Sequence, residues 1–168
     1  MKIEINKASY EDMSDVAEIL KSSAHWYEKF VDEKDMDQHN VDEEWIDENY
    51  KKREFYVTKN KEGKSIGTIS LQNFDDQTTY LGYVYLDVNY VGNGIGRKLI
   101  SFAEELSSER GQEEMILLAH PEAKWATKAY EKYGFEKIHE KKEDVISYKG
   151  NLLESYYEEG FHLYRYKL

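Results

Sequence analysis

The stretch YVGNGIGRKL, Tyr90–Leu99, places a glycine at every second position: Gly92, Gly94 and Gly96. An apolar run precedes it and an amphipathic run follows, which predicts a turn between a strand and a helix. Such a turn lets backbone N–H groups converge on an anion, and the helix dipole adds to the attraction. The stretch is therefore a candidate phosphate-binding turn.

Two common nucleotide-binding patterns do not fit this turn. A P-loop ends in Gly-Lys-Ser/Thr, whereas Gly96 is followed by Arg97 and Lys98. A dinucleotide-binding fingerprint has its third glycine three residues after the second, and that position is again Arg97. The spacing alone leaves two interpretations, a turn that binds a ligand and a glycine-rich turn that binds none.

Composition restricts the class of protein. The chain has 168 residues, 40% of them hydrophobic and 34% charged, which predicts a single domain over residues 1–168. It contains no cysteine, which excludes disulfides, thiolate metal ligands and a cysteine nucleophile. The net charge of −11 argues against a nucleic-acid partner, whose phosphates need a basic surface. No membrane-length apolar run or signal-peptide pattern occurs, so we expect no membrane partner and a cytoplasmic location.

The negative charge is concentrated between Glu28 and Glu48, where ten acidic residues accompany two lysines. One interpretation is a solvated helical surface. The other is an acidic rim that attracts a cationic substrate.

Hydrophobic periodicity predicts a mixed α/β chain, with antiparallel strands first and a β-α-β-α-β half after them. Strands are expected at 1–8, 54–58, 65–73, 81–88, 115–119, 135–140 and 161–168. Helices are expected after Ser9, at 42–53, after the glycine turn to about Gly111, and at 123–132. Residues 140–160 exceed the length of a simple hairpin and are expected to form a lid or a dimer contact, so a homodimer is one expected assembly.

Two motifs together resemble the GNAT superfamily of N-acetyltransferases. Tyr85–Leu99 (YLDVNYVGNGIGRKL) resembles its acetyl-CoA motif, and Ala126–Phe135 (ATKAYEKYGF) resembles its second motif, a helix ending in Tyr-Glu-Lys-x-Gly-Phe. The motifs occur in the family's order with an apolar strand between them. The resemblance implies an α/β (α+β) fold with a mixed, largely antiparallel central sheet flanked by helices. Acetyl-CoA would bind at the strand–glycine loop–helix.

The resemblance also implies which residues hold acetyl-CoA. Backbone N–H groups from Gly92 to Arg97 would bind the pyrophosphate, and the strand backbone at Leu86 and Val88 would pair with the pantetheine arm. The expected cofactor-binding residues are Leu86, Asp87, Val88, Val91, Gly92, Asn93, Gly94, Ile95, Gly96, Arg97 and Lys98. Val91 replaces the family's usual Gln or Arg, which removes one side-chain contact to the phosphates and leaves the backbone cradle intact. Ala123 replaces a common Asn, and neither change abolishes the mechanism. No metal is expected, because no convincing ligand set is present.

The resemblance places Tyr130 at the family's general-acid position, where a tyrosine hydroxyl protonates the departing CoA thiolate. A packing role is the alternative, since the chain has 15 tyrosines. The position of the family's common glutamate base is Tyr80. His120, which follows the 115–119 strand, is the expected substitute. A turn histidine beside Pro121 and a water relay to other groups are the alternatives.

The resemblance implies that the first two helices and the last hairpin select the acceptor. These segments contain His25, Trp26, Tyr27, Trp45, Tyr50, Tyr148, Tyr156, Tyr157 and Tyr164. Trp26, Tyr27 and Tyr80 are the expected substrate-binding residues, because aromatic faces beside carboxylates suit cationic amines; core packing is the alternative. The expected function is transfer of the acetyl group of acetyl-CoA to a primary amine, a small cationic one, by direct attack. The alternatives are a protein or peptide N-acetyltransferase and a non-catalytic acyl-CoA-binding module.

Overall fold

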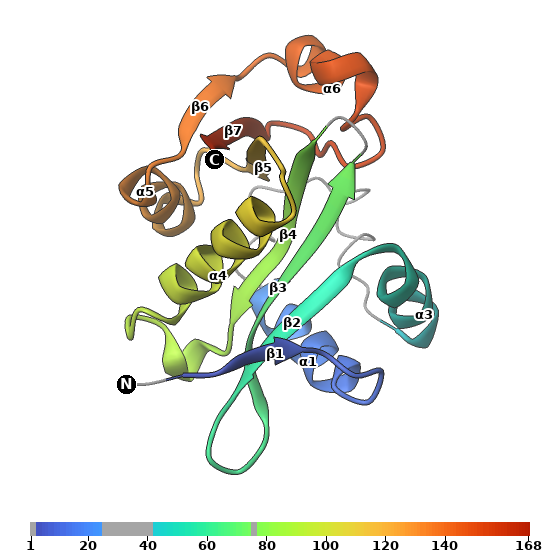
Figure 1. Ribbon diagram of the computed structural model, residues 1–168, viewed down its shortest axis with the longest axis vertical. Coiled ribbons are helices and arrows are strands. Elements are labelled where there is room, and N and C mark those ends of the chain that lie inside the picture. The colour runs from blue at the N-terminus through green and yellow to red at the C-terminus, as the bar shows by residue number, and fades with distance from the viewer. Residues whose placement is uncertain (1–2, 25–41, 75–76) are drawn as a thin grey trace.

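The computed structural model describes residues 3–24, 42–74 and 77–168 (Figure 1). The described strands are β1 (Ile5–Lys7), β2 (Glu54–Lys59), β3 (Ser65–Phe74), β4 (Thr78–Leu86), β5 (Glu114–Ala119), β6 (Glu136–His139) and β7 (His162–Lys167). The described helices are α1 (Met13–Ala24), α3 (Glu43–Lys52), α4 (Ile95–Glu109), α5 (Lys124–Tyr133) and α6 (Lys142–Asn151), with a 3₁₀ turn η2 (Val88–Tyr90).

The seven strands form one sheet in the order β1-β2-β3-β4-β5-β7-β6. The β4–β5 pair is parallel, because α4 carries the chain from one strand to the next, and the other pairs are antiparallel. The predicted mixed, largely antiparallel sheet flanked by helices is confirmed. The element boundaries shift by a few residues; β4, for example, begins at Thr78 rather than at residue 81.

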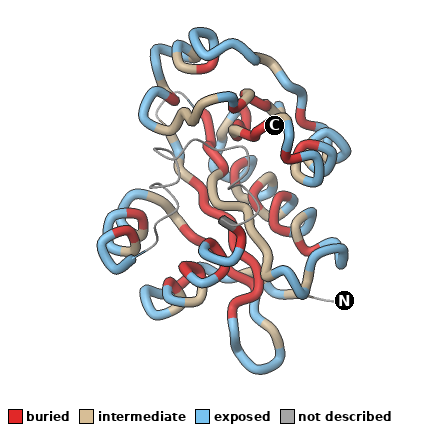
Figure 2. The backbone as a smooth tube through the Cα atoms, turned by 180° about the vertical axis from the view of Figure 1, so that it is seen from behind, coloured by how far each residue is buried: buried red, intermediate tan, exposed pale blue. Residues whose placement is uncertain are grey.

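Alternation along the strands builds a core on each side of the sheet. On β2, Tyr56 packs beneath α4, whereas Phe55 and Val57 pack against α1 and α3 on the opposite face. On β5, Met115 lies in the α4 core and Ile116 lies opposite, among buried residues of the α6 region. Helices α4 and α5 therefore cover one face, called the α4 face, and α1, α3 and α6 cover the other, called the α1 face (Figures 1 and 2).

The parallel pair separates partway along its length. β4 and β5 pair only from Thr78 opposite Glu114 to Tyr80 opposite Ile116. β4 then continues to Leu86 and β5 to Ala119 without pairing to each other. The two strands thus leave a wedge in the middle of the sheet, bordered by backbone groups that have no ladder partner on that side.

A β-bulge lies on the β4 side of this wedge. Ser70 of β3 pairs with Gly82 and Thr68 pairs with Tyr85, so Ile69 opposes two residues of β4. Tyr83, the first of these two, has φ of +50°, in the left-handed region that non-glycine residues rarely adopt. The backbone at the bulge is therefore locally strained, and the packing around it must stabilise this conformation.

The segment after β6 packs on the α1 face. Its helix α6 is interrupted at Tyr148–Gly150, where the backbone is non-helical. The Tyr148 hydroxyl and the Lys149 ammonium both reach the carboxylate of Glu114 at the start of β5, at 2.7 and 3.2 Å. Leu153 is fully buried further on. Val145 and Leu153 thus anchor residues 140–160 on this face, and their expected role as a lid or a dimer contact stays a prediction.

Candidate active site

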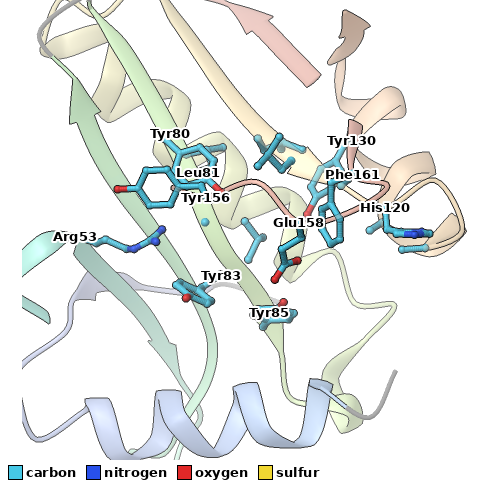
Figure 3. A pocket seen from close by; sticks show the side chains of 17 residues that line it. Arg53, Tyr80, Leu81, Tyr83, Tyr85, His120, Tyr130, Tyr156, Glu158 and Phe161 are labelled. Carbon is cyan, nitrogen blue, oxygen red and sulfur yellow. The ribbon is translucent and has the colours of Figure 1, made fainter. Parts of the chain in front are cut away.

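Two cavities meet beside the wedge between β4 and β5. The larger, of about 540 Å³, lies between the end of β4, the glycine turn, α4 and α5. The smaller, of about 110 Å³, lies between β4, β5, the end of α3 and residues 156–161 (Figure 3). Four residues line both cavities: Val84, Tyr85, Ala126 and Tyr130. A ligand in the larger cavity can therefore present a reacting group to a second ligand in the smaller one.

The glycine turn forms an uncapped helix start at the larger cavity. Gly92 and Gly94 have φ of +93° and +78°, which only glycine adopts readily. Gly94 is the N-cap of α4, and no side chain caps that helix. The first backbone N–H groups of α4 have no intrahelical acceptor and carry the positive end of the helix dipole. This geometry suits an anionic group such as a phosphate.

The rest of the larger cavity combines positive charge with apolar surface. Arg97 lies over the Tyr133 ring, 5.1 Å from its centre, and lines the wall. Val88, Val91 and Trp125, three of the large apolar side chains most exposed among the described residues, also line it. Exposed apolar groups around a cavity indicate a binding site. The cavity thus suits a ligand that carries phosphates and a long partly apolar portion.

Tyr130 projects from α5 at the junction of the cavities (Figure 3). Its ring packs edge-on against Phe135, with ring centres 6.0 Å apart. Its carbonyl accepts hydrogen bonds from Gly134 and Phe135, which end the helix. The end of the helix and the aromatic contact together set the direction of the Tyr130 side chain.

His120 follows β5 directly and lines the smaller cavity. Its Nδ1 accepts a hydrogen bond from the backbone N–H of Glu122 at 3.1 Å, and its ring lies edge-on to Phe161. Burial lowers the pKa of His120, and the negative charges of Glu122 and Glu158 partly oppose that shift. The imidazole is therefore neutral at pH 7.

The smaller cavity is lined by aromatic rings, one positively charged side chain and one negatively charged side chain. Tyr80, Tyr83 and Tyr85 of β4 and Tyr156 line it, together with Arg53 and Glu158 (Figure 3). The rings of Tyr80 and Tyr156 pack at a tilt with their centres 4.9 Å apart, and the Tyr156 hydroxyl donates to Gln72 at 2.6 Å. Burial raises the pKa of Tyr80, so its hydroxyl stays protonated. These groups can hold a small polar molecule next to Tyr130.

A sequence model of the acetyltransferase (GNAT) family matches residues 16–135. The chain belongs to the acetyltransferase (GNAT) family. It is an acetyl-CoA-dependent acetyltransferase, and acetyl-CoA is its co-substrate. No curated protein sequence matches the chain significantly.

Solved structures share this fold at low sequence identity. PaiA N-acetyltransferase from Thermoplasma acidophilum, solved with coenzyme A, is 21% identical over all of both chains, with a TM-score of 0.76. A GNAT acetyltransferase from Staphylococcus aureus is 20% identical over 99% of each chain, with a TM-score of 0.75. N-acetylglutamate synthase from Neisseria gonorrhoeae, solved with coenzyme A and N-acetyl-glutamate, is 14% identical; the match covers all of this chain and 35% of that one, with a TM-score of 0.69.

The sequence-based cofactor residues of this GNAT domain gather at the larger cavity. Those that line it are Leu86, Val88, Val91, Gly92, Gly94, Gly96 and Arg97. The other four side chains have different surroundings. Asp87 accepts from the backbone N–H of Asn89, Asn93 donates to the carbonyl of Tyr90, Ile95 is buried in the core, and Lys98 is exposed on α4.

The sequence-based acceptor residues divide between the cavity and the core. Tyr80 and Tyr156 line the smaller cavity, whereas Trp26 and Tyr27 lie outside the described residues. Trp45 and Tyr164 are buried in the core. Five further lining residues were not predicted as acceptor residues from the sequence: Arg53, Tyr83, Tyr85, Glu158 and Phe161. No local signal marks them, because they come from three separate segments.

The part of the chain that the structure describes contains neither a metal-binding cluster nor a membrane-spanning helix. No three His, Asp or Glu side chains there lie close enough together to hold a metal ion. No helix there is long and apolar enough to cross a lipid bilayer.

Proposed function

We propose that this GNAT enzyme transfers the acetyl group of acetyl-CoA directly to the primary amine of a small cationic acceptor. The observation that carries the proposal is the junction of the two cavities at Tyr130. The larger cavity has the phosphate cradle, and the smaller one has the aromatic and acidic groups that suit an ammonium ion. Direct transfer needs both ligands at one point, and the shared lining of the two cavities supports such an arrangement.

Different residues of the site carry out the successive steps of the transfer. The N–H groups at the start of α4 hold the pyrophosphate, so that the thioester of acetyl-CoA lies near the junction. His120 takes a proton from the bound ammonium group, which leaves a lone pair on the acceptor nitrogen. This nitrogen forms a bond to the thioester carbonyl carbon, and the carbon–sulfur bond breaks. Tyr130 gives its hydroxyl proton to the leaving thiolate, the acetylated nitrogen releases its second proton to solvent, and Tyr130 regains a proton from solvent. The products are the N-acetylated acceptor and CoA.

The size of the smaller cavity favours a small acceptor over a folded protein. Its volume of about 110 Å³ is well below that of a drug-sized ligand pocket, which is on the order of 300 Å³ or more. Glu158 supplies a carboxylate for the ammonium group, and Tyr83 and Tyr85 supply ring faces. A lysine side chain or a peptide N-terminus would have to enter through the same small volume.

The proposal is tested by CoA release from acetyl-CoA with a panel of acceptors. We expect release with small primary amines and much slower release with lysine-containing peptides or N-terminal peptides at equal concentration. Peptides as the better acceptors would make this a peptide N-acetyltransferase. No release with any acceptor, from protein that binds acetyl-CoA, would support a non-catalytic acyl-CoA-binding module.

Glu158→Gln is the matched variant for the ammonium site. It keeps the shape of the side chain and removes its charge, so KM for the amine should rise about 10- to 100-fold, as expected for a lost charge-assisted hydrogen bond. The affinity for acetyl-CoA is the internal control, because Glu158 lines only the smaller cavity. An unchanged KM for every amine would remove Glu158 from the acceptor site.

The pH profile tests His120. A neutral imidazole is the basic form, so activity should fall as the pH drops through the His120 pKa, which burial holds below its usual value of about 6.5. Protonation of His120 at Nδ1 would also break the hydrogen bond that Nδ1 accepts from the Glu122 N–H. This loss also lowers the pKa of His120. We therefore expect kcat/KM to hold down to about pH 6.5 and to decline below it.

His120→Gln is the variant for this measurement. It should lower kcat about 100-fold and remove the acidic decline, as loss of a general base does. Wild-type turnover with an unchanged acidic decline in His120→Gln would show that another group accepts the proton.

The remaining sequence-based expectations stay predictions. They are the cytoplasmic location, the absence of a nucleic-acid or membrane partner, the homodimer and the single domain over residues 1–168. Gel filtration of the purified chain measures the homodimer directly.

A further inference from the structure

Arg53 projects into the smaller cavity in a defined orientation. It is the C-cap of α3 and stands immediately before β2. Its Nε donates to the Oδ1 of Asn49 at 3.2 Å, and the Nδ2 of the buried Asn49 donates in turn to the Trp45 carbonyl at 3.0 Å. These bonds along one stripe of α3 direct the guanidinium toward β4 (Figure 3).

Three tyrosine rings surround the guanidinium. Its Cζ lies 4.9 Å from the ring centre of Tyr83, 5.0 Å from that of Tyr156 and 5.7 Å from that of Tyr80. The contact with β4 depends on a glycine, because a Cβ at Gly82 would lie 2.6 Å from Nη1. The Arg53 charge is thus set against the wedge-facing stretch of β4, beyond its pairing with β5.

The Nη atoms have no protein acceptor within the described ranges. A guanidinium has five N–H donors, and the one at Nε is used by Asn49. The described residues place no carboxylate within 4.0 Å of Arg53, and Nη1 and Nη2 make no hydrogen bond to them. The guanidinium is thus a half-buried cation that is held in place without a counter-charge. Binding of an anion beside such a cation is favourable in free energy.

We propose that the acceptor is an amino-acid-type molecule, whose carboxylate binds the two Nη groups of Arg53 while its amine faces Glu158 and Tyr130. The proposal rests on the proposed function for the transfer to the amine. Gly82, beside the guanidinium, and Tyr85, at the cavity junction, are three residues apart, at most about 10 Å along a strand. A small molecule with its amine a few bonds from its carboxylate spans this length. A planar carboxylate also matches the fork of a guanidinium.

Binding of matched acid and amide pairs tests the proposal without requiring turnover. Each of the common amino acids and its carboxamide is titrated by calorimetry into the protein saturated with CoA. We expect the best acid to bind about 10- to 100-fold more tightly than its amide, because only the acid offers a carboxylate to Arg53. In Arg53→Gln this ratio should fall close to one.

Two further variants separate local contact from general effects. Gly82→Ala places a methyl group against Nη1 and should lower the same ratio while the positive charge remains. Lys52→Gln is the charge-matched control, because Lys52 is exposed, outside the cavity lining, with its ammonium 4.5 Å from the Tyr156 ring centre. It removes one positive charge beside the site and should leave the ratio unchanged.

Equal binding of acids and amides by the wild-type protein would overturn the proposal. A ratio that survives in Arg53→Gln, or that falls equally in Lys52→Gln, would overturn it as well. The proposed function has a different failure, since it requires CoA release with an amine of some kind. Release with amines that lack a carboxylate, and no preference for acids in calorimetry, would retain amine acetylation and reject this acceptor class.

Discussion

Tyr130→Phe should lower kcat for CoA release by about 100- to 10,000-fold, or roughly 3 to 5 kcal/mol of barrier. The change deletes only the hydroxyl that we assign as proton donor to the thiolate. The ring remains, so the edge-on contact with Phe135 and the walls of both cavities are kept. The affinity for acetyl-CoA and the melting temperature should therefore stay close to wild type. Single-turnover CoA release is the measurement.

Tyr133→Phe is the matched control for Tyr130→Phe. Tyr133 lies one turn further along α5, and its hydroxyl donates to the carboxylate of Glu104 in α4. Loss of that bond should lower the melting temperature, with a loss of kcat far smaller than that of Tyr130→Phe. Wild-type CoA release by folded Tyr130→Phe protein would show that Tyr130 is not the acid.

Gly96→Glu should weaken acetyl-CoA binding by about 30- to 1,000-fold without weakening the fold. Gly96 lies in the first turn of α4, and a Cβ there would meet only Leu86, at an ordinary contact distance of 3.9 Å. A carboxylate at a helix N-terminus also stabilises the helix. The same carboxylate would repel the pyrophosphate by roughly 2 to 4 kcal/mol at a separation of about 4 to 8 Å. Calorimetry with CoA gives the affinity.

Gly96→Gln and Gly96→Ala separate charge from size. Gln has nearly the shape of Glu without its charge, and Ala adds only a methyl group, so CoA affinity should rank Ala above Gln above Glu. Gly94 is a poorer probe, because its φ of +78° makes any side chain there strained. Undiminished CoA binding by stable Gly96→Glu protein would place the pyrophosphate elsewhere.

Local sequence was enough to predict the glycine turn and the helix that follows it. A turn with glycine at 92, 94 and 96, between an apolar strand and an amphipathic helix, dictates an uncapped helix start, because glycine both adopts positive φ and lacks a capping side chain. The strands and the other helices also follow from periodicity, within a few residues, but α6 (Lys142–Asn151) was not predicted. These features depend on residues that are neighbours in the chain, so they can be predicted from the sequence.

The acceptor side was decided by the tertiary structure. Strict alternation along β4 would place Tyr83 and Tyr85 on the side opposite Tyr80. The bulge opposite Ile69 adds one residue, so Gly82 and Tyr83 lie on the same side and all three tyrosines line the α1 face. No pattern of residue types in the sequence predicts this β-bulge.

The charges of the smaller cavity depend even more on distant segments. Arg53 comes from the end of α3 and Glu158 from the turn before β7, and they meet at the wedge that β4 and β5 leave between them. That wedge exists because the parallel pair ends at Tyr80 and Ile116 while both strands continue. The sequence by itself therefore determined the fold class and the uncapped helix start at the glycine turn, which follow from local patterns. Only the tertiary structure decided which charges face the acceptor, because strand separation, the bulge and the packing of residues 140–160 are properties of the assembled sheet.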